Sequence, residues 1–208
     1  MSKIDAVLLK EMILSGANNL VNEKALIDKL NVFPVPDGDT GTNMSLTIES
    51  AVSELESSNI NTITEIGKAI TKGSLMGARG NSGVILSQLL RGFAKSIENK
   101  DELTIEDIAL ALDSAREVAY KAVIKPVEGT ILTVVRQTAE EALKIYKNHK
   151  DMKFFLEELL EASNNSLNHT PELLKALKDA NVVDSGGKGF VVFFEGLYRG
   201  FIGEPVKK

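Results

Sequence analysis

The sequence contains no cysteine, which excludes disulfide bonds and thiolate metal sites and is compatible with a reducing compartment. It also lacks any run of about twenty apolar residues, the length that a membrane-spanning helix needs. The first residues mix Asp5 and Lys10 with apolar side chains, a pattern typical of an amphipathic helix rather than a signal peptide. We therefore expect a cytoplasmic protein without stable membrane insertion.

There is no excess of positive charge either. Lys and Arg total 24 and Asp and Glu total 29, which gives a net charge of -5 at pH 7. Non-specific nucleic-acid binding requires a basic face that neutralises phosphates, so nucleic acid is not an expected partner. The hydrophobic fraction of 43% is that of an ordinary folded protein. The chain of 208 residues is long enough for one well-buried domain or at most two small ones.

Apolar residues recur at helical spacing along almost the whole chain, and strict alternation is absent. Val191–Phe194 has the composition of a buried strand, but Leu197 and Phe201 continue a helical spacing, so we interpret this segment as helix. The predicted helical segments are 4–30, 43–57, 62–72, 82–98, 104–123, 130–147, 151–167, 171–179 and 187–201. This pattern predicts an all-α barrel or bundle of about eight amphipathic antiparallel helices. We assign 1–202 to this domain and interpret 203–208 as the start of a linker to further domains.

The first junction with chemical content is the segment 31–43. Two prolines lead into Asp37 and Asp39, which are separated by Gly38 and followed by Gly41. Two carboxylates this close repel each other unless a cation lies between them, and hard oxygen ligands favour Mg²⁺, Mn²⁺ or Ca²⁺ over zinc. The simplest alternative is a turn with solvated carboxylates. An EF-hand does not fit, because the positions that require Gly and Glu are occupied here by Thr42 and Ile48.

The second junction, 73–83, combines four glycines with Arg79, Asn81 and Ser82 immediately before an apolar helix. Free backbone N–H groups and the helix dipole favour an anion at such a helix start, whereas simple capping by Asn81 or Ser82 is the alternative. The segment is neither a Walker A loop nor a Rossmann fingerprint, because no Gly-Lys-Ser/Thr follows and no strand precedes it. A phosphate site is our interpretation.

Two later junctions, 125–130 and 183–189, also open helices and contain glycine. In an up-down bundle, alternate junctions lie at the same end of the molecule. Several helix N-termini at one rim, together with metal-binding carboxylates, would form the polyanion site that phosphoryl transfer needs.

Taken together, the segments 31–43, 76–88, 125–132 and 183–189 resemble the DhaL (DAK2) nucleotide-binding domain of dihydroxyacetone kinases, over essentially the whole chain. The closest resemblance is to the N-terminal domain of the large, ATP-binding subunit of bacterial fatty acid kinase. The resemblance implies an eight-helix barrel that binds ATP or ADP at one end through two Mg²⁺ ions.

The same resemblance assigns roles to individual residues. Asp37 and Asp39 match metal-binding aspartates of the family, and Asn31 stands near the place of a third metal ligand. The residues matched to nucleotide contacts are Thr40, Gly41, Thr42, Asn43, Gly80, Asn81, Ser82, Gly83, Thr130, Ile131, Asp184, Ser185 and Gly186. Thr130 and Ile131 match the segment beside the adenine. Arg79 is either a charge stabiliser for the transferring phosphoryl group or a structural residue that binds loop carbonyls.

The function implied is transfer of the γ-phosphoryl group of ATP to a fatty acid carboxylate, which gives an acyl phosphate for phospholipid synthesis. The implied partner is a separate acyl-binding protein that carries the fatty acid, and the full-length subunit is a possible homodimer. A dihydroxyacetone-type kinase subunit, a nucleotide sensor without transfer activity, and a structural bundle with a Ca²⁺-stiffened loop are the alternatives.

Overall fold

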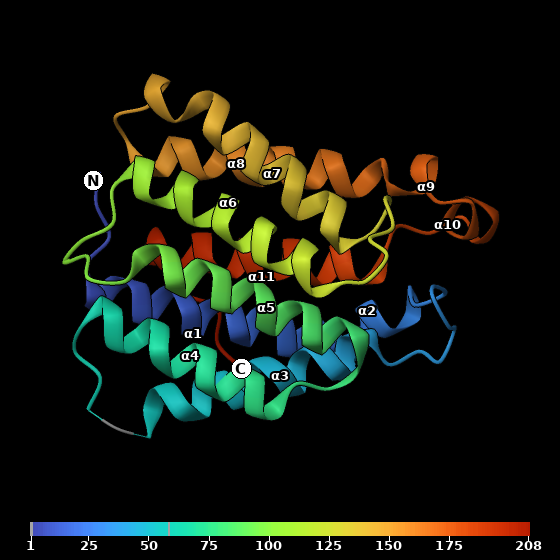
Figure 1. The fold of residues 1–208 in the computed structure, drawn as a ribbon, viewed down its shortest axis with the longest axis horizontal. Helices are drawn as coiled ribbons and strands as arrows, with labels where there is room; N and C mark the ends of the chain where they lie inside the picture. The colour runs from blue at the N-terminus through green and yellow to red at the C-terminus, as the bar shows by residue number, and fades with distance from the viewer. Residues whose placement is uncertain (1, 58) are drawn as a thin grey trace.

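The structure, a computed structural model, describes residues 2–57 and 59–208, and within these ranges it contains no β-strand beyond one bridge between Ile4 and Leu103. Eight helices of 15 to 18 residues form its body (Figure 1). They are α1 (Ala6–Asn22), α3 (Thr40–Glu56), α4 (Ile63–Gly77), α5 (Gly80–Ile97), α6 (Ile105–Ala122), α7 (Ile131–Ile145), α8 (Met152–Asn168) and α11 (Ser185–Phe201). The short helices are α2 (Lys24–Lys29), η1 (Tyr146–Asn148), α9 (Thr170–Leu173) and α10 (Lys175–Ala180). The prediction of an all-α fold with about eight long helices is confirmed.

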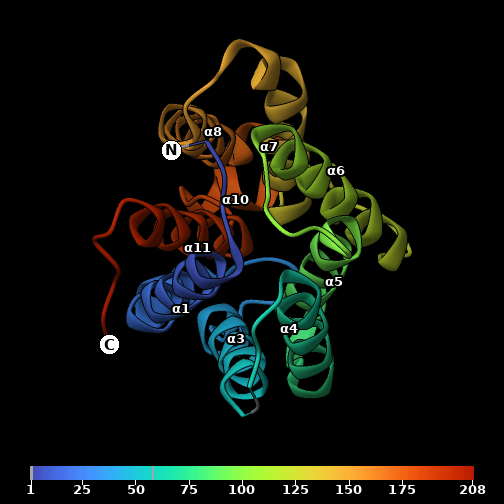
Figure 2. The same cartoon turned by 90° about the vertical axis from the view of Figure 1, so that its left-hand side faces the viewer.

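The long helices form a closed ring, which Figure 2 shows from one end. Each packs against its neighbours in the order α1, α3, α4, α5, α6, α7, α8 and α11, and α11 packs back on α1. Neighbours in the ring run in opposite directions. As a result, α3, α5, α7 and α11 all begin at the right-hand end in Figure 1.

The inward faces of all eight helices contribute to one hydrophobic core. The segment Val191–Phe194 is buried and helical within α11, so its interpretation as helix is confirmed. The contact between α1 and α11 is close because it is lined with glycine. A Cβ atom on Gly196 would lie 2.6 Å from the Cα of Gly16, so both positions exclude larger side chains.

Two segments predicted as continuous helices are divided in the structure. The N-terminal segment breaks at Glu23, which lets α2 turn and pack against α3. The segment 171–179 breaks at Leu174, whose backbone is extended and whose Cβ lies against Gly129. In both places a tertiary contact outweighs the local helical pattern.

Helix starts at the left-hand end in Figure 1 follow the sequence signals closely. Thr62 and Thr104 each form a capping box with the residue three positions later, Glu65 and Asp107. Reciprocal bonds of this kind satisfy backbone N–H groups that a helix otherwise leaves open. The helix start predicted at Thr104 is thereby confirmed.

The last residues fold back along α1. Val206 is buried, its backbone N–H donates to Ser15 Oγ at 2.9 Å, and its carbonyl accepts from Asn18 Nδ2 at 3.1 Å. The segment 203–208 is therefore packed against the domain in this structure, and the predicted continuation into further domains stays a prediction. None of the helices in the described ranges is both long and apolar enough to cross a bilayer.

Candidate functional site

A cavity of about 700 Å³ opens at the end of the barrel where α3, α5, α7 and α11 begin. The first residue of each of these helices lines it: Thr40, Gly80, Ile131 and Ser185. Each helix N-terminus carries a partial positive charge, so four helix dipoles converge on one space. This arrangement favours an anion with several charges.

The loop between α2 and α3 forms one wall of this cavity. Asp37 is exposed and Asp39 is partly exposed, and both line the space. Gly38 between them has a φ of +66°, a conformation that other residues rarely adopt, and it permits the sharp turn that brings both aspartates to the same wall.

The side chain of Asn31 is hydrogen-bonded to the backbone of this loop. Its side chain is buried, its Oδ1 accepts from the backbone N–H of Asp39 at 3.1 Å, and its Nδ2 donates to the carbonyl of Val35 at 3.2 Å. The amide is therefore a structural clamp on the loop as well as part of the cavity lining. An amide oxygen has two lone pairs, so the bond to Asp39 leaves one available to a cation.

The start of α3 is fixed by a side chain from α2. The carboxylate of Asp28 on α2 accepts from the backbone N–H of Thr42 at 2.9 Å and from its hydroxyl at 2.7 Å. Asp28 thus caps α3 in place of a residue in the preceding loop. The hydroxyl of Thr42 is engaged in this contact, and Thr42 does not line the cavity.

The start of α5 has a different character. Its N-cap residue, Arg79, makes no side-chain cap hydrogen bond, and among the described residues no side chain bonds the first backbone N–H groups of this helix. Gly80 has a φ of +65° and packs against the side chain of Asn43. Asn81 and Ser82 follow at the cavity wall, so open N–H donors and two small polar side chains face the same space.

The helices that begin at the other end show what is unusual about α5. There α1, α4, α6 and α8 are all capped by a side chain, from Asp5, Thr62, Thr104 and Asp151. At the cavity end Thr130 caps α7 and Asp184 caps α11, but α5 is left open. Uncapped donors at a cavity wall are available to a ligand.

The loop before α7 is held by a polar network outside the cavity. The carboxylate of Glu128 accepts from Arg136 Nη2 at 2.7 Å, from Tyr120 at 2.9 Å and from Thr133 at 2.9 Å. Partial burial raises the pKa of Glu128, but these bonds outweigh it and hold the pKa below its usual range. The network fixes the end of the loop that places Thr130 at the cavity.

Asp184 is the buried carboxylate of the cavity, with 4% of its surface exposed. Its Oδ2 accepts from the backbone N–H of Gly187 at 2.8 Å, and its own N–H donates to Thr170 Oγ1 at 3.0 Å. Burial raises the pKa of Asp184 to about 6, against the opposing effect of the backbone bonds. The charged form is therefore costly in the free protein.

Most of the predicted site residues line this one cavity. They are Asn31, Asp37, Asp39, Thr40, Asn43, Gly80, Asn81, Ser82, Thr130, Ile131, Asp184, Ser185 and Gly186. Gly41, Thr42, Gly83 and Arg79 do not line it. Gly41 and Gly83 are buried because they pack against Lys24 and Thr47, and Arg79 is exposed.

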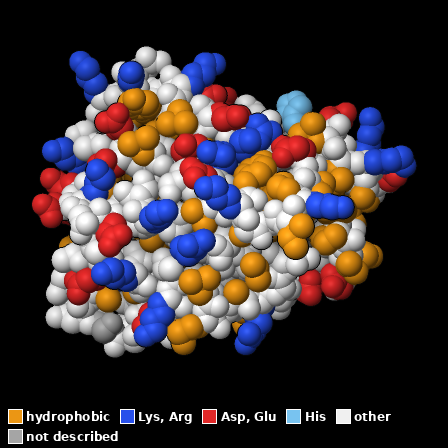
Figure 3. All heavy atoms as spheres, viewed as in Figure 1, with side chains coloured by type: hydrophobic (Ala, Val, Ile, Leu, Met, Phe, Trp, Pro, Cys, Tyr) orange, Lys and Arg blue, Asp and Glu red, His pale blue; other side chains and the backbone are white. Residues whose placement is uncertain are grey.

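Several apolar residues at the cavity were not predicted as site residues, among them Val84, Ile85 and Val123. Ile124, which is 98% exposed, also stands at its edge with Val35. Figure 3 shows hydrophobic side chains gathered toward this end of the molecule. Their position directly beside the glycine-containing motifs is the signal that could have identified them.

Comparison with known proteins bears on the same segments. The DAK2 domain family matches residues 34–199. The chain belongs to the DAK2 domain family. The match extends from the aspartate loop to α11, so it includes all four helix starts at the cavity.

Relatives in staphylococci are longer than this DAK2 domain. An uncharacterized protein of Staphylococcus epidermidis is 51% identical over 206 residues, which cover 99% of this chain and 37% of that protein. An uncharacterized protein of Staphylococcus aureus is 50% identical over 206 residues, which cover 99% of this chain and 38% of that protein. The chain thus spans little more than a third of the length of these relatives.

Solved structures share the fold. The dihydroxyacetone kinase from C. freundii, in complex with AMP-PNP and Mg²⁺, matches with a TM-score of 0.69 and 16% identity over 96% of this chain and 35% of that chain. Its native form matches with a TM-score of 0.67 and 16% identity, over 96% of this chain and 36% of that chain. At 16% identity, these similarities show that the chain shares its fold with the two structures and show nothing further.

Proposed function

We propose that this DAK2 domain binds Mg·ATP in the cavity at the starts of α3, α5, α7 and α11 and serves as the nucleotide-binding part of a kinase. The observation that carries the proposal is the convergence of Asp37 and Asp39 with the open N-terminus of α5. Carboxylates hold a cation, and free N–H groups and helix dipoles hold phosphates. The related fold of the C. freundii kinase, a complex with AMP-PNP and Mg²⁺, supports the same assignment.

The donor set suits Mg²⁺. Within the described ranges no three His, Cys, Asp or Glu side chains form a group that could hold a metal alone. Mg²⁺ commonly uses one or two protein carboxylates and completes its coordination with phosphate oxygens and water. Asp37 and Asp39 would supply the carboxylates and Asn31 a further oxygen, and the bound ions would neutralise charge on the triphosphate.

The remaining residues would bind and orient the nucleotide. Backbone N–H groups of Gly80, Asn81 and Ser82 would donate to phosphate oxygens, and Thr130 and Ile131 would lie beside the base. Positioning and charge neutralisation account for most of the catalysis that a protein supplies in phosphoryl transfer. Arg79 is exposed and does not line the cavity in the free protein, so it would stabilise charge on the transferring group only by turning its side chain toward the bound triphosphate. The variant Arg79→Gln should lower turnover while leaving ATP affinity unchanged.

We further propose that the acceptor is a fatty acid carboxylate presented by a separate acyl-binding protein. A carboxylate is already ionised at neutral pH, so it needs no general base from this domain. The exposed apolar side chains at the cavity edge, Val35, Val84 and Ile124, support a surface that a partner covers during transfer. Dihydroxyacetone is the alternative acceptor, and the shared fold with dihydroxyacetone kinase supports it.

Calorimetry of the domain with ATP, with and without Mg²⁺, tests the nucleotide site. Asp37→Asn and Asp39→Asn should each weaken Mg·ATP binding about 10- to 100-fold, by loss of charge-assisted contacts. The matched control is Asp101→Asn, an exposed aspartate in the loop before α6. Unchanged affinity in both site variants would refute the proposal.

A transfer assay distinguishes the acceptors and the nucleotide-sensor alternative. The longest natural chain that contains this domain is incubated with labelled ATP and either dihydroxyacetone or a fatty acid bound to its acyl-binding protein. Label on the fatty acid supports the proposal, and label on dihydroxyacetone supports the alternative kinase. Binding without transfer to either acceptor would identify a sensor. Melting that responds to Ca²⁺ but not to nucleotide would identify a structural bundle.

A further inference from the structure

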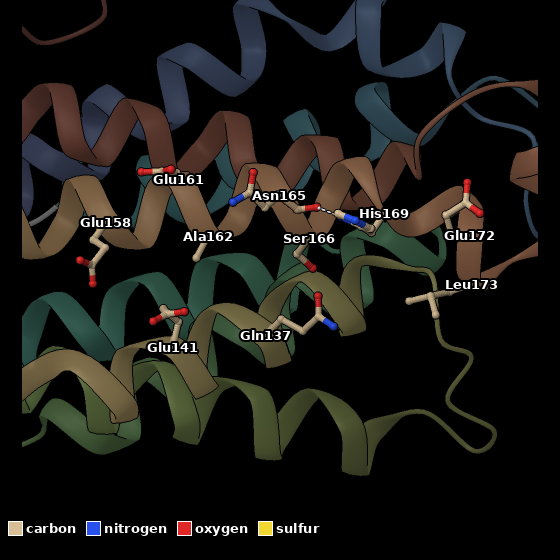
Figure 4. Close-up of a pocket in the computed structure, with 10 residues that line it drawn as sticks. All are labelled: Gln137, Glu141, Glu158, Glu161, Ala162, Asn165, Ser166, His169, Glu172 and Leu173. Atoms are coloured by element: carbon tan, nitrogen blue, oxygen red, sulfur yellow. Dashed lines mark hydrogen bonds between the residues drawn. The ribbon is translucent and has the colours of Figure 1, made fainter.

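A second cavity lies on the outer surface between α7 and α8, with a volume of about 670 Å³. Figure 4 shows side chains of the two helices facing each other across it, and α9 closes one end. Among the described residues none lines both this groove and the nucleotide cavity. The volume falls in the range of small-molecule sites.

The described residues that line the groove include several carboxylates and no Lys or Arg. Four glutamates line it, namely Glu141, Glu158, Glu161 and Glu172. Glu172 forms a surface ion pair with Lys178 at 3.6 Å, and Glu158 lies 3.5 Å from Nε2 of His149. Glu141 and Glu161 have no ion-pair partner in the part of the chain that the structure describes.

One buried hydroxyl in the groove lacks a partner. Ser166 Oγ is the only buried side-chain N or O atom in the described ranges without a hydrogen bond, and the residue is 5% exposed. In Figure 4 its hydroxyl points into the space between α8 and α7, toward Gln137. A buried polar group without a partner costs free energy, so a donor entering the groove would be stabilised there.

His169 adds a further acceptor to the groove, and the side-chain amides of Gln137 and Asn165 each offer an acceptor as well as donors. The ring of His169 bonds through Nδ1 to the carbonyl of Asn165 at 2.7 Å. A carbonyl oxygen only accepts, so in the neutral imidazole Nδ1 carries the proton and Nε2 is left as an acceptor. Ala162 and Leu173 add apolar surface between these groups. The lining therefore combines several acceptors with two small apolar surfaces.

The acceptors follow one face of α8. The interval from Glu158 to His169 corresponds to about 16 Å at the usual helical rise of about 1.5 Å per residue. That length is comparable with an extended aliphatic chain carrying three or four amino groups. A single metal ion binds ligands around one point, at about 2.0–2.6 Å, so it does not account for acceptors spread over this length.

We propose that the α7–α8 groove binds a linear aliphatic polyamine. Its ammonium groups donate to Glu141, Glu161 and Ser166 Oγ, and its methylene segments lie on Ala162 and Leu173. Ammonium–carboxylate pairs of this kind are charge-assisted hydrogen bonds. The site is separate from the proposed nucleotide cavity, so its occupation does not depend on the proposed kinase function.

Calorimetry with spermidine and with spermine tests this proposal, in the absence of nucleotide because polyamines also associate with phosphates. We expect saturable one-to-one binding that weakens as salt increases. Glu141→Gln and Glu161→Gln should each weaken it about 5-fold, and the double variant about 20-fold. Glu49→Gln, on the exposed face of α3, removes the same charge outside the groove and should leave the affinity unchanged.

Ser166→Ala adds a readout that a purely structural role would not reproduce. It should weaken spermine binding about 3-fold and should also raise the melting temperature of the free protein, because it removes an unsatisfied hydroxyl. The proposal is overturned if spermine gives no saturable heat, if Glu49→Gln weakens binding as much as Glu161→Gln, or if Mg²⁺ at equal ionic strength displaces spermine as well as another polyamine does. Binding of a lysine-rich peptide in the absence of polyamine binding would equally overturn it.

Discussion

The hydroxyl of Ser185, the first residue of α11, donates a hydrogen bond of 3.0 Å to the hydroxyl of Thr40, the first residue of α3. The two residues are 145 positions apart in the sequence, and both line the proposed nucleotide cavity. The bond is buried and joins the aspartate loop to the last helix of the barrel. It therefore ties the proposed metal-binding and phosphate-binding walls into one unit.

A double-mutant cycle measures this connection. Thr40→Val and Ser185→Ala should each lower the free energy of unfolding by about 1–2 kcal/mol, because each leaves a buried hydroxyl without its partner. The double variant should cost less than the sum of the two, with a coupling of about 1 kcal/mol. Urea unfolding of the four proteins checks this. Strictly additive effects would show that the bond contributes nothing to stability.

Asn31 allows its two roles to be separated by one substitution. Asn31→Asp keeps an oxygen acceptor for the N–H of Asp39 but replaces the amide that donates to the carbonyl of Val35. If Asn31 acts mainly by holding the loop, the variant protein should lose about 1–2 kcal/mol of unfolding free energy and bind Mg·ATP more weakly, because a carboxylate now faces a carbonyl. If Asn31 acts mainly as a metal ligand, the variant protein should bind Mg²⁺ more tightly, because a charged oxygen replaces a neutral one. Calorimetric titration with Mg²⁺ at fixed ATP, alongside urea unfolding, distinguishes the two roles.

Helical spacing and the loop motifs were sufficient to predict much of this architecture. The capping box at Thr104 could be read locally, because its partner Asp107 lies three residues away. The convergence of 80–82, 130–131 and 184–186 with the aspartate loop could be expected because alternate junctions of an up-down bundle lie at the same end. These features depend on short-range patterns or on the topology of an up-down barrel.

Contacts between distant residues could not be predicted in the same way. Asp28 caps α3 from α2 because the chain breaks at Glu23 and turns, and no local pattern specifies that turn. The unpartnered hydroxyl of Ser166 depends on how α8 rotates against α7. A helical pattern gives the buried face of each helix but not the residue that it meets.

The Glu128–Arg136 pair should contribute more to stability than an ordinary surface ion pair does. The guanidinium also bonds Tyr120 at 3.2 Å, and the bond to Glu128 is the main cause that raises the pKa of Arg136 above its usual value. Arg136→Gln should cost about 1–2 kcal/mol of stability and weaken ATP binding by loosening the loop that carries Thr130. Thermal unfolding and calorimetry provide the measurement.

The control for that substitution is an exposed ion pair of the same protein. Lys121→Gln breaks the pair between Lys121 and Glu117, whose side chains are 75% and 53% exposed. Its cost should stay below about 0.5 kcal/mol. Equal effects of the two substitutions would contradict a special role for the Glu128 network.

Gly41 illustrates a steric requirement at the start of α3. A Cβ atom at this position would overlap the carbonyl oxygen of Lys24 and lie 3.0 Å from the Cβ of Ile27. Gly41→Ala should therefore push α2 away from α3 and lower stability by about 2–4 kcal/mol. Gly203→Ala is the matched control, because it meets open space and costs only the strain of its φ of +80°, about 1 kcal/mol. A similar cost at both positions, measured by urea unfolding, would show that α2 adjusts freely.

The buried carboxylate of Asp184 makes stability depend on pH in a defined direction. Its pKa is raised from 3.8 in the unfolded chain to about 6 in the folded protein. Between these values the folded state binds more protons than the unfolded state, so its contribution is fully present below pH 4 and is lost as the pH rises through 6. The shift corresponds to about 3 kcal/mol.

Asp184→Asn removes the titrating group while keeping an oxygen that accepts from the N–H of Gly187. Any packing cost of the amide is the same at every pH, so it cancels when the difference in unfolding free energy between the two proteins is followed from pH 4.5 to 7.5. Over that interval the natural protein should lose about 2 kcal/mol relative to the variant. Thr130→Ala, which removes the cap of α7 without removing a titrating group, should give a constant difference. A flat difference for Asp184→Asn would mean that the folded protein stabilises the charged carboxylate as well as water does, and the cavity would then lack the strained acid that its burial implies.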